Sequence, residues 1–148
     1  MRAQLVLDGV DPFPLYGTSQ TRCFCYVDDE IRGIMALDRS TVVGPVNIGN
    51  PVETTLLDLA DQVLAVTGAT SSVIFQPLPE DDPVRRRPDI TLARTLLDWE
   101  PAVDLTEGLC RTADWLSANL GLASPGRAIS GHQDQGANGQ RWRSASRV

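Results

Sequence analysis

The sequence contains no lysine, and all 13 of its basic side chains are arginine. A Schiff-base lysine, a lysine that lowers the pKa of a tyrosine and the lysine of a Walker-type phosphate loop are therefore excluded within this chain. Histidine is almost as scarce, since His132 is the only one and lies in a polar segment. The chain therefore has almost no histidine to serve as a metal ligand or as the base in Ser-His or Cys-His catalysis.

Cysteines and long apolar runs are also scarce. Cys23, Cys25 and Cys110 form an odd set without zinc-type spacing, so we expect reduced structural thiols. No apolar run approaches the roughly 18 residues that a membrane span requires. Residues 1–11 lack the apolar core of a signal peptide. We therefore expect no membrane association and a cytoplasmic location.

The 148 residues suffice for one domain with a core, and charge is divided unevenly along them. Residues 122–148 carry four arginines and one aspartate (+3), whereas residues 1–121 carry nine arginines and 18 acidic side chains (−9). An acidic body argues against broad nucleic-acid binding. Because residues 122–148 are rich in Ser, Gly, Gln and Asn without apolar periodicity, we predict a disordered basic tail there.

Turn signals and apolar periodicity predict a small mixed α/β unit over residues 1–121, with a charged loop at 77–88. Residues 1–9 are expected to end a helix. The expected strands lie at residues 15–16, 23–27, 44–49 and 72–75. The expected helices lie at residues 28–37, 55–66, 91–97 and 105–120.

Three polar residues near these element boundaries have both a chemical and a structural interpretation. Asp28 and Asp29 could be a carboxylate pair for acid–base chemistry, but aspartates at a helix start are explained by capping and the helix dipole. We therefore interpret Asp28 as the N-cap of the helix at 28–37. Asn47 could hydrogen-bond a ligand or stabilise the turn at Gly49, and the turn is the simpler interpretation.

Arginines in two segments are candidates for an anion site. Arg22 follows a polar turn, and residues 85–87 are three arginines in a loop before a proline. Guanidinium groups bind phosphate oxygens in pairs, and adjacent cations in an acidic body suggest a local anion site. From spacing alone, a solvated Arg22 is the simpler interpretation. The arginine run could instead be neutralised by its neighbours Asp81, Asp82 and Asp89.

Several motifs occur in the order found in one enzyme family. They are PLYGTSQTRCFCYVDDEIRGI, GPVNIGNPVETTLLDLA, PLPEDDPVRRRPDITLARTLLDWEP and a final LxEGL-type helix. Together they resemble the C-terminal half of UDP-glucuronate decarboxylase (UDP-xylose synthase). That enzyme belongs to the extended short-chain dehydrogenase/reductase family of NAD-dependent nucleotide-sugar epimerases, dehydratases and decarboxylases. The resemblance covers about residues 1–121.

The resemblance implies a small mixed α/β substrate domain, which closes over a nucleotide sugar while a Rossmann half holds NAD. It assigns the diphosphate to Arg22, a substrate phosphate or carboxylate to Arg86, the border of the nucleotide to Tyr16 and a place near the phosphates to Asn47. Two arginines on separate loops can neutralise a dianionic diphosphate from opposite sides.

The sequence departs from the family in lacking its glycine-rich dinucleotide loop and its Tyr-x-x-x-Lys pair. In the family, that tyrosine is the base for oxidation at sugar C4, and the lysine lowers its pKa. We therefore expect no catalytic residue in this chain and no binding of NAD by this chain alone. We expect a truncated family member whose Rossmann half is missing.

The resulting expectation is the substrate-binding portion of a UDP-glucuronate decarboxylase-like enzyme, inactive alone. Two alternatives remain open: a non-catalytic nucleotide-sugar-binding or interaction fragment, and a fragment of a nucleotide-sugar 4-epimerase or 4,6-dehydratase. The expected partners are UDP-glucuronate and either a separate Rossmann-domain chain or a second copy of this one. Nucleic acid and membranes are not expected partners.

Overall fold

The computed structural model describes residues 13–17 and 19–120, which form two compact units. Of the described residues, 13–17, 57–82 and 109–120 belong to the first unit, and 19–56 and 83–108 belong to the second. The helix expected over residues 1–9 and the tail expected over 122–148 lie outside the described residues. No helix within 13–17 and 19–120 is long and apolar enough to cross a membrane.

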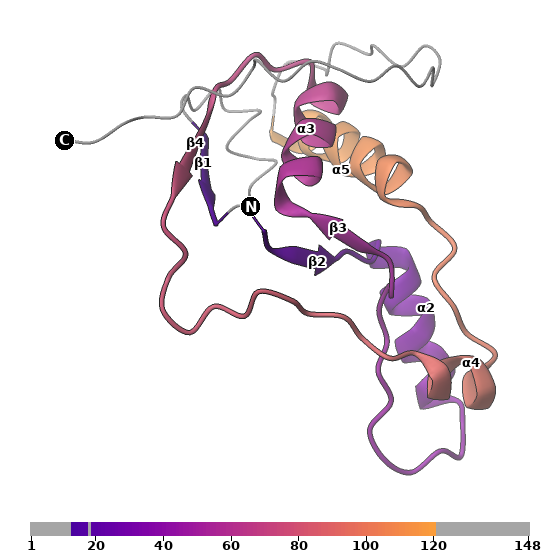
Figure 1. Cartoon of the computed structure of the whole chain (residues 1–148). Helices are drawn as coiled ribbons and strands as arrows, with labels where there is room; N and C mark the ends of the chain where they lie inside the picture. Colours follow the sequence, from indigo (N-terminus) through magenta and orange to yellow (C-terminus); the bar gives the residue numbers. More distant parts are fainter. Residues whose placement is uncertain (1–12, 18, 121–148) are drawn as a thin grey trace, which may run out of the picture. The chain divides into compact units, whose positions relative to one another are not determined.

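The first unit contains a two-stranded parallel sheet (Figure 1). Strand β1 (Phe13–Tyr16) pairs with β4 (Val73–Gln76) in register from Phe13↔Val73 to Tyr16↔Gln76. Nearly all of helix α3 (Leu56–Thr67) and most of α5 (Leu105–Leu120) belong to the same unit. Its buried apolar side chains come from both strands and both helices: Leu15, Ala60, Val63, Leu64, Val66, Val73 and Ala113.

The second unit is built on an antiparallel ribbon of β2 (Thr21–Cys23) and β3 (Glu53–Thr55). The free edge of β2 meets the loop at residues 83–90, which carries the three adjacent arginines and which we call the arginine loop, through a parallel bridge between Thr21 and Arg85. The Thr21 amide also donates to the Val84 carbonyl at 3.0 Å. The arginine loop therefore pairs with the ribbon at Val84 and Arg85, where the arginine run begins.

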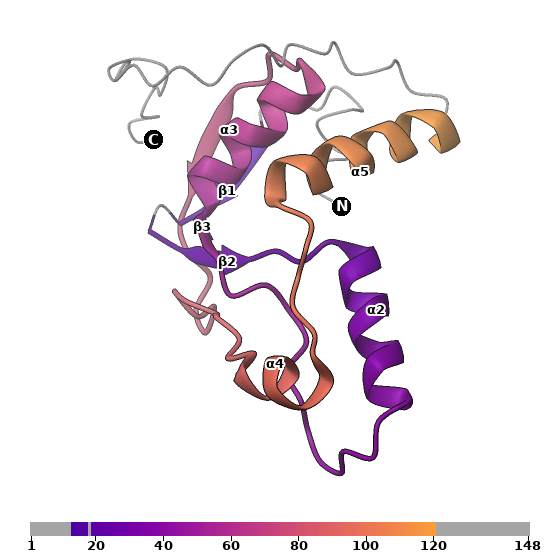
Figure 2. The same cartoon turned by 90° about the vertical axis from the view of Figure 1, so that its right-hand side faces the viewer.

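Two helices complete the second unit, α2 (Val27–Asp38) and α4 (Thr91–Leu97), which lie side by side in both views (Figures 1 and 2). Ile90, Ala93 and Trp99 form its core. Cys25, Val46, Ile48 and Leu97 pack against that core. A Cβ at Gly33 of α2 would lie 2.5 Å from Ile48 Cγ2 and 3.0 Å from the Trp99 ring, so glycine permits this close approach.

The aspartate pair differs from the expectation. Helix α2 begins at Val27, its N-cap is Tyr26 without a side-chain cap, and Asp28 lies exposed in the first turn. The interpretation of Asp28 as the N-cap was therefore wrong. Asp29 is buried instead, and its Oδ2 accepts hydrogen bonds from the Ala102 and Val103 amides, both at 2.9 Å. This carboxylate ties α2 to the segment after Trp99.

Two of the expected strands do not match the structure, whereas the expected bounds of the helices lie close to the observed ones. The expected strand at 23–27 was wrong because β2 ends at Cys23, and the segment 44–49 forms no strand. The helix expected at 91–97 matches α4, and α5 begins at Leu105 as expected. The Glu107 amide donates to Asp104 Oδ1 at 2.8 Å, which confirms Asp104 as the capping side chain of α5.

Candidate functional site

An open depression of about 590 Å³ lies in the second unit, where the arginine loop passes β2. Its lining comes from β2 and the residue Cys25 after it, from the first turn of α2, from residues 48–50 and from the arginine loop. The lining residues are Arg22, Cys23, Cys25, Glu30, Ile48, Gly49, Asn50, Arg85, Arg86, Arg87 and Pro88. We call this site the arginine depression.

Arg22 reaches the depression from the middle of β2. Its NH1 group donates to the Thr21 carbonyl at 2.8 Å and to the Val84 carbonyl at 3.3 Å. These bonds orient the guanidinium along the arginine loop instead of leaving it extended into solvent. Arg22 is therefore partly preorganised, which lowers the entropy lost when a ligand binds.

Arg85, Arg86 and Arg87 are all exposed, but Arg86 differs from the other two in making no hydrogen bond or ion pair with another described residue. Its neighbours behave differently. Arg85 donates through Nε to Glu53 Oε1 at 2.6 Å and through NH2 to Glu53 Oε2, and Arg87 NH1 lies 3.9 Å from the same Oε2. The carboxylate that forms ion pairs with the arginine run is thus Glu53 of β3, which the sequence did not single out. Of the expected neighbours, Asp89 also interacts with Arg87, whose charge helps to lower the pKa of the Asp89 carboxyl.

The charges of the site sum to a net positive value. In the lining, Arg22 and the three loop arginines contribute +4 and Glu30 contributes −1. Glu53, which pairs with Arg85 from outside the lining, contributes a further −1 and leaves +2. The hydrogen bonds from Arg85 and Thr21 hold the pKa of Glu53 below its usual range, so this carboxylate is ionised at neutral pH. The net charge suits a dianionic group.

The two cysteines of the lining are poor nucleophiles. Burial, followed by the nearby Glu30 carboxylate, raises the pKa of Cys25 to about 12. Burial and Glu53 likewise raise the pKa of Cys23. Both thiols are protonated at neutral pH, and only a thiolate attacks a substrate or binds a metal. Within the described part of the chain, no group of His, Cys, Asp or Glu could hold a metal ion.

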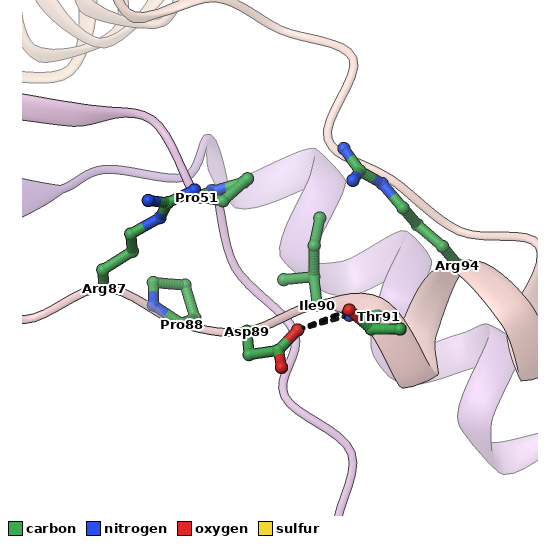
Figure 3. Close-up of a pocket in the computed structure, with 7 residues that line it drawn as sticks. All are labelled: Pro51, Arg87, Pro88, Asp89, Ile90, Thr91 and Arg94. Atoms are coloured by element: carbon green, nitrogen blue, oxygen red, sulfur yellow. Dashed lines mark hydrogen bonds between the residues drawn. The ribbon is translucent and has the colours of Figure 1, made fainter.

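A second, smaller depression of about 280 Å³ shares Arg87 and Pro88 with the first (Figure 3). Figure 3 shows Arg87 and Arg94 at its two ends. Asp89 accepts hydrogen bonds from the amide and the hydroxyl of Thr91, which lower the pKa of its carboxyl. Because Arg94 already pairs with Glu100 at 3.2 Å, its guanidinium is less available to an anion than that of Arg86 in the arginine depression.

The structure brings two of the four expected ligand residues to one place. Arg22 and Arg86 both line the arginine depression. Asn47 does not line it. Its Nδ2 donates to the Asp89 carbonyl at 3.0 Å and so ties the segment before Ile48 to the arginine loop. Tyr16 belongs to the first unit and is 40% exposed, and its contact with a nucleotide stays a prediction.

No family model matches the chain, but individual proteins do. UDP-glucuronic acid decarboxylase 1 from Danio rerio is 46% identical over 107 residues, which are 72% of this chain and 26% of that protein. The epimerase Mth375 from Methanothermobacter thermautotrophicus matches with a TM-score of 0.76 and 30% identity, covering 80% of this chain and 36% of the epimerase. The chain belongs to the extended short-chain dehydrogenase/reductase family.

A third match is to an enzyme that was solved with a nucleotide sugar bound. UDP-glucuronic acid 4-epimerase from Bacillus cereus, solved in complex with UDP-glucuronic acid and NAD, matches with a TM-score of 0.66 and 29% identity. The match covers 74% of this chain and 37% of that epimerase. The chain thus spans about a quarter of the curated relative and little more than a third of the solved family members.

Proposed function

We propose that this chain is the nucleotide-sugar-binding portion of a UDP-glucuronic acid decarboxylase-like enzyme, and that Arg22 and Arg86 bind the diphosphate of UDP-glucuronate. The observation that carries the proposal is the convergence of these two arginines on one depression with a net charge of +2. The 46% identity to UDP-glucuronic acid decarboxylase 1 supports the choice of substrate.

The geometry supports the two arginines in complementary roles. Arg22 is held by the backbone carbonyls of Thr21 and Val84, so it presents a fixed cation. Arg86 comes from the loop and has its planar fork of donors available for two phosphate oxygens. A volume of about 590 Å³ lies within the usual range of ligand pockets, about 300–1,000 Å³.

The chain does not fit NAD, the cofactor of the family. It has no lysine and no Gly-x-Gly-x-x-Gly loop, the features that hold the nicotinamide ribose and the pyrophosphate. We therefore assign substrate binding to this chain and no proton or hydride transfer. Purified chain supplied with UDP-glucuronate and NAD should form no UDP-xylose above background.

A partner that supplies the nucleotide-binding half follows from the same proposal. Helix α2 exposes Ile31, Ile34 and Met35 by 51%, 56% and 45%. These side chains recur at helical spacing on one face, and such faces mark interaction sites. A Rossmann-domain chain of this family, or a second copy of this chain, is the partner that the proposal implies.

Calorimetric titration of the full chain with UDP-glucuronate tests the proposal. We expect saturable binding that Arg22→Ala and Arg86→Ala each weaken by about 10- to 100-fold, since a hydrogen bond to a charged group contributes about 1.5–3 kcal/mol. Arg111→Ala, in α5 of the first unit, is the control and should bind as the wild type does. No binding by the wild-type chain would refute the proposal.

A nucleotide-sugar 4-epimerase or 4,6-dehydratase is the second candidate, because the solved structures that match include such enzymes. The same two arginines would serve any nucleotide diphosphate sugar. Titration with UDP-glucose separates the candidates: a UDP-glucuronate-specific chain should bind it more weakly, whereas equal or tighter binding would favour the second candidate.

A further inference from the structure

We propose that Glu53 is a positioning residue of the arginine depression. By pairing with Arg85, Glu53 keeps that arginine from binding the ligand, and it holds the arginine loop so that Arg86 can bind the ligand. This inference rests on the proposed function, because the ligand is the diphosphate of that proposal. Glu53 itself is not in the lining of the depression.

The first argument is the number of segments that one carboxylate joins. Glu53 lies on β3 and accepts a hydrogen bond from the Thr21 hydroxyl of β2 at 2.9 Å. It also accepts two hydrogen bonds from the guanidinium of Arg85 in the loop. The Glu53 side chain is 21% exposed and that of Arg85 is 62% exposed, so the carboxylate is partly covered while the guanidinium faces solvent, and the fork-to-fork geometry supplies the specificity of the pair.

The second argument is the alternation of side chains along the arginine run. Glu53 lies within ion-pair distance of Arg85 and of Arg87, whereas Arg86 makes no such contact with a described residue. Successive side chains of an extended segment point to opposite sides. Holding Arg85 and Arg87 toward Glu53 therefore turns Arg86 away from it.

The third argument is the register of the loop against β2. The Thr21 amide donates to the Val84 carbonyl, and the parallel bridge pairs Thr21 with Arg85. One residue further along both segments, this register places Arg22 beside Arg86. The Glu53–Arg85 pair spans β2 at this bridge, so it stabilises the register that brings the two proposed ligands together.

Positioning and simple electrostatics predict opposite results when Glu53 is removed. Without its negative charge the site would be more positive, and Coulomb attraction alone would make a diphosphate bind a few times more tightly. If Glu53 positions the loop, Glu53→Ala leaves Arg86 to be ordered by the ligand itself, and binding weakens. The sign of the change therefore distinguishes the two roles.

The experiment is a titration of the full chain with UDP. We expect Glu53→Ala to bind about tenfold more weakly than the wild type and Glu53→Gln, which keeps an amide oxygen as acceptor, to fall between them. Glu80→Ala removes the same charge from an exposed turn of the first unit and should leave binding unchanged. Binding by Glu53→Ala equal to or tighter than the wild type would overturn the inference.

Hydrogen exchange tests the positioning role without a ligand. In Glu53→Ala the Thr21 amide, which donates to Val84, should exchange at least about tenfold faster, while the Trp99 amide, which donates to Ala93, keeps its protection. Unchanged exchange at Thr21 would overturn the inference. If the wild type binds no UDP, the proposed function fails and this exchange comparison still decides the role of Glu53. If the Trp99 amide also loses protection in Glu53→Ala, that variant has unfolded the whole unit. The same comparison of exchange at Thr21 and Trp99 in Glu53→Gln then tests the positioning role of Glu53.

Discussion

Removing the buried carboxylate of Asp29 should destabilise the second unit by several times more than removing the adjacent exposed one. The side chain of Asp29 is 3% exposed and accepts from two amides at 2.9 Å and from Arg32. Asp29→Asn turns the two amide bonds from charge-assisted into neutral ones, a loss of about 1 kcal/mol each. Asp29→Ala removes the acceptor altogether, and about 3–4 kcal/mol should be lost.

The other contributions at this site are smaller. Arg32 is 49% exposed, so its ion pair with Asp29 contributes less than about 1 kcal/mol. Asp28 is exposed in the first turn of the same helix and interacts with the helix dipole, so Asp28→Asn should change the stability by less than about 1 kcal/mol. Asp28→Asn is therefore the matched control.

Urea unfolding followed by tryptophan fluorescence measures these effects. Trp99 is 2% exposed and its indole N–H donates to the Asp29 carbonyl at 3.0 Å, so its emission reports on this unit. The expected order of stability is wild type, then Asp28→Asn, Asp29→Asn and Asp29→Ala. A loss of less than about 1 kcal/mol in Asp29→Ala would refute the reasoning, because the two amide bonds would then contribute almost nothing.

The same carboxylate makes the stability depend on pH in a definite direction. Burial alone would raise the pKa of Asp29, but the hydrogen bonds from Val103, Arg32 and Ala102 outweigh it and lower the pKa. A carboxyl with a depressed folded-state pKa stabilises the fold above its unfolded pKa of about 3.9, and the contribution is lost as the pH falls below that value. In Asp29→Asn this part of the acid sensitivity should disappear.

Two further predictions concern packing and thiol reactivity. Gly33→Ala should destabilise the second unit by about 1–3 kcal/mol in urea unfolding, because the new Cβ would lie 2.5 Å from Ile48 Cγ2; unchanged stability would show that Ile48 moves aside freely. Iodoacetamide at pH 8 should modify Cys25 at least about tenfold more slowly in the folded chain than in urea, since burial raises its pKa to about 12. Equal rates by peptide mass spectrometry would contradict a half-buried, protonated thiol at Cys25.

The helices could be predicted from the sequence because their signals are local. The periodicity and the polar starts of α4 and α5 lie within the helices or one turn away, so α4 was placed correctly at 91–97. The β2–β3 ribbon could not be placed in the same way. Glutamate is disfavoured in strands, and Glu53–Thr55 forms a strand because it pairs with residues 30 to 34 positions earlier.

Asp29 and Glu53 show the same limit for polar side chains. Asp28 and Asp29 are adjacent residues of the same type, so the local sequence does not say which of them is buried. Asp29 is the buried one because its carboxylate accepts hydrogen bonds from residues 102–103, more than 70 positions away. Arg22 and Arg86 were singled out because their motifs resemble a family. Glu53 had only an indirect signal: three adjacent arginines require a counter-ion, and a carboxylate within a β-prone segment is a candidate for it.

The structure of this chain with UDP-glucuronate bound is the most direct test of the central claim. The account predicts the diphosphate in the arginine depression, with its oxygens within about 3.2 Å of the guanidinium groups of Arg22 and Arg86. Arg85 should remain paired with Glu53 in that complex. A diphosphate bound elsewhere on the chain, away from both arginines, would contradict the account.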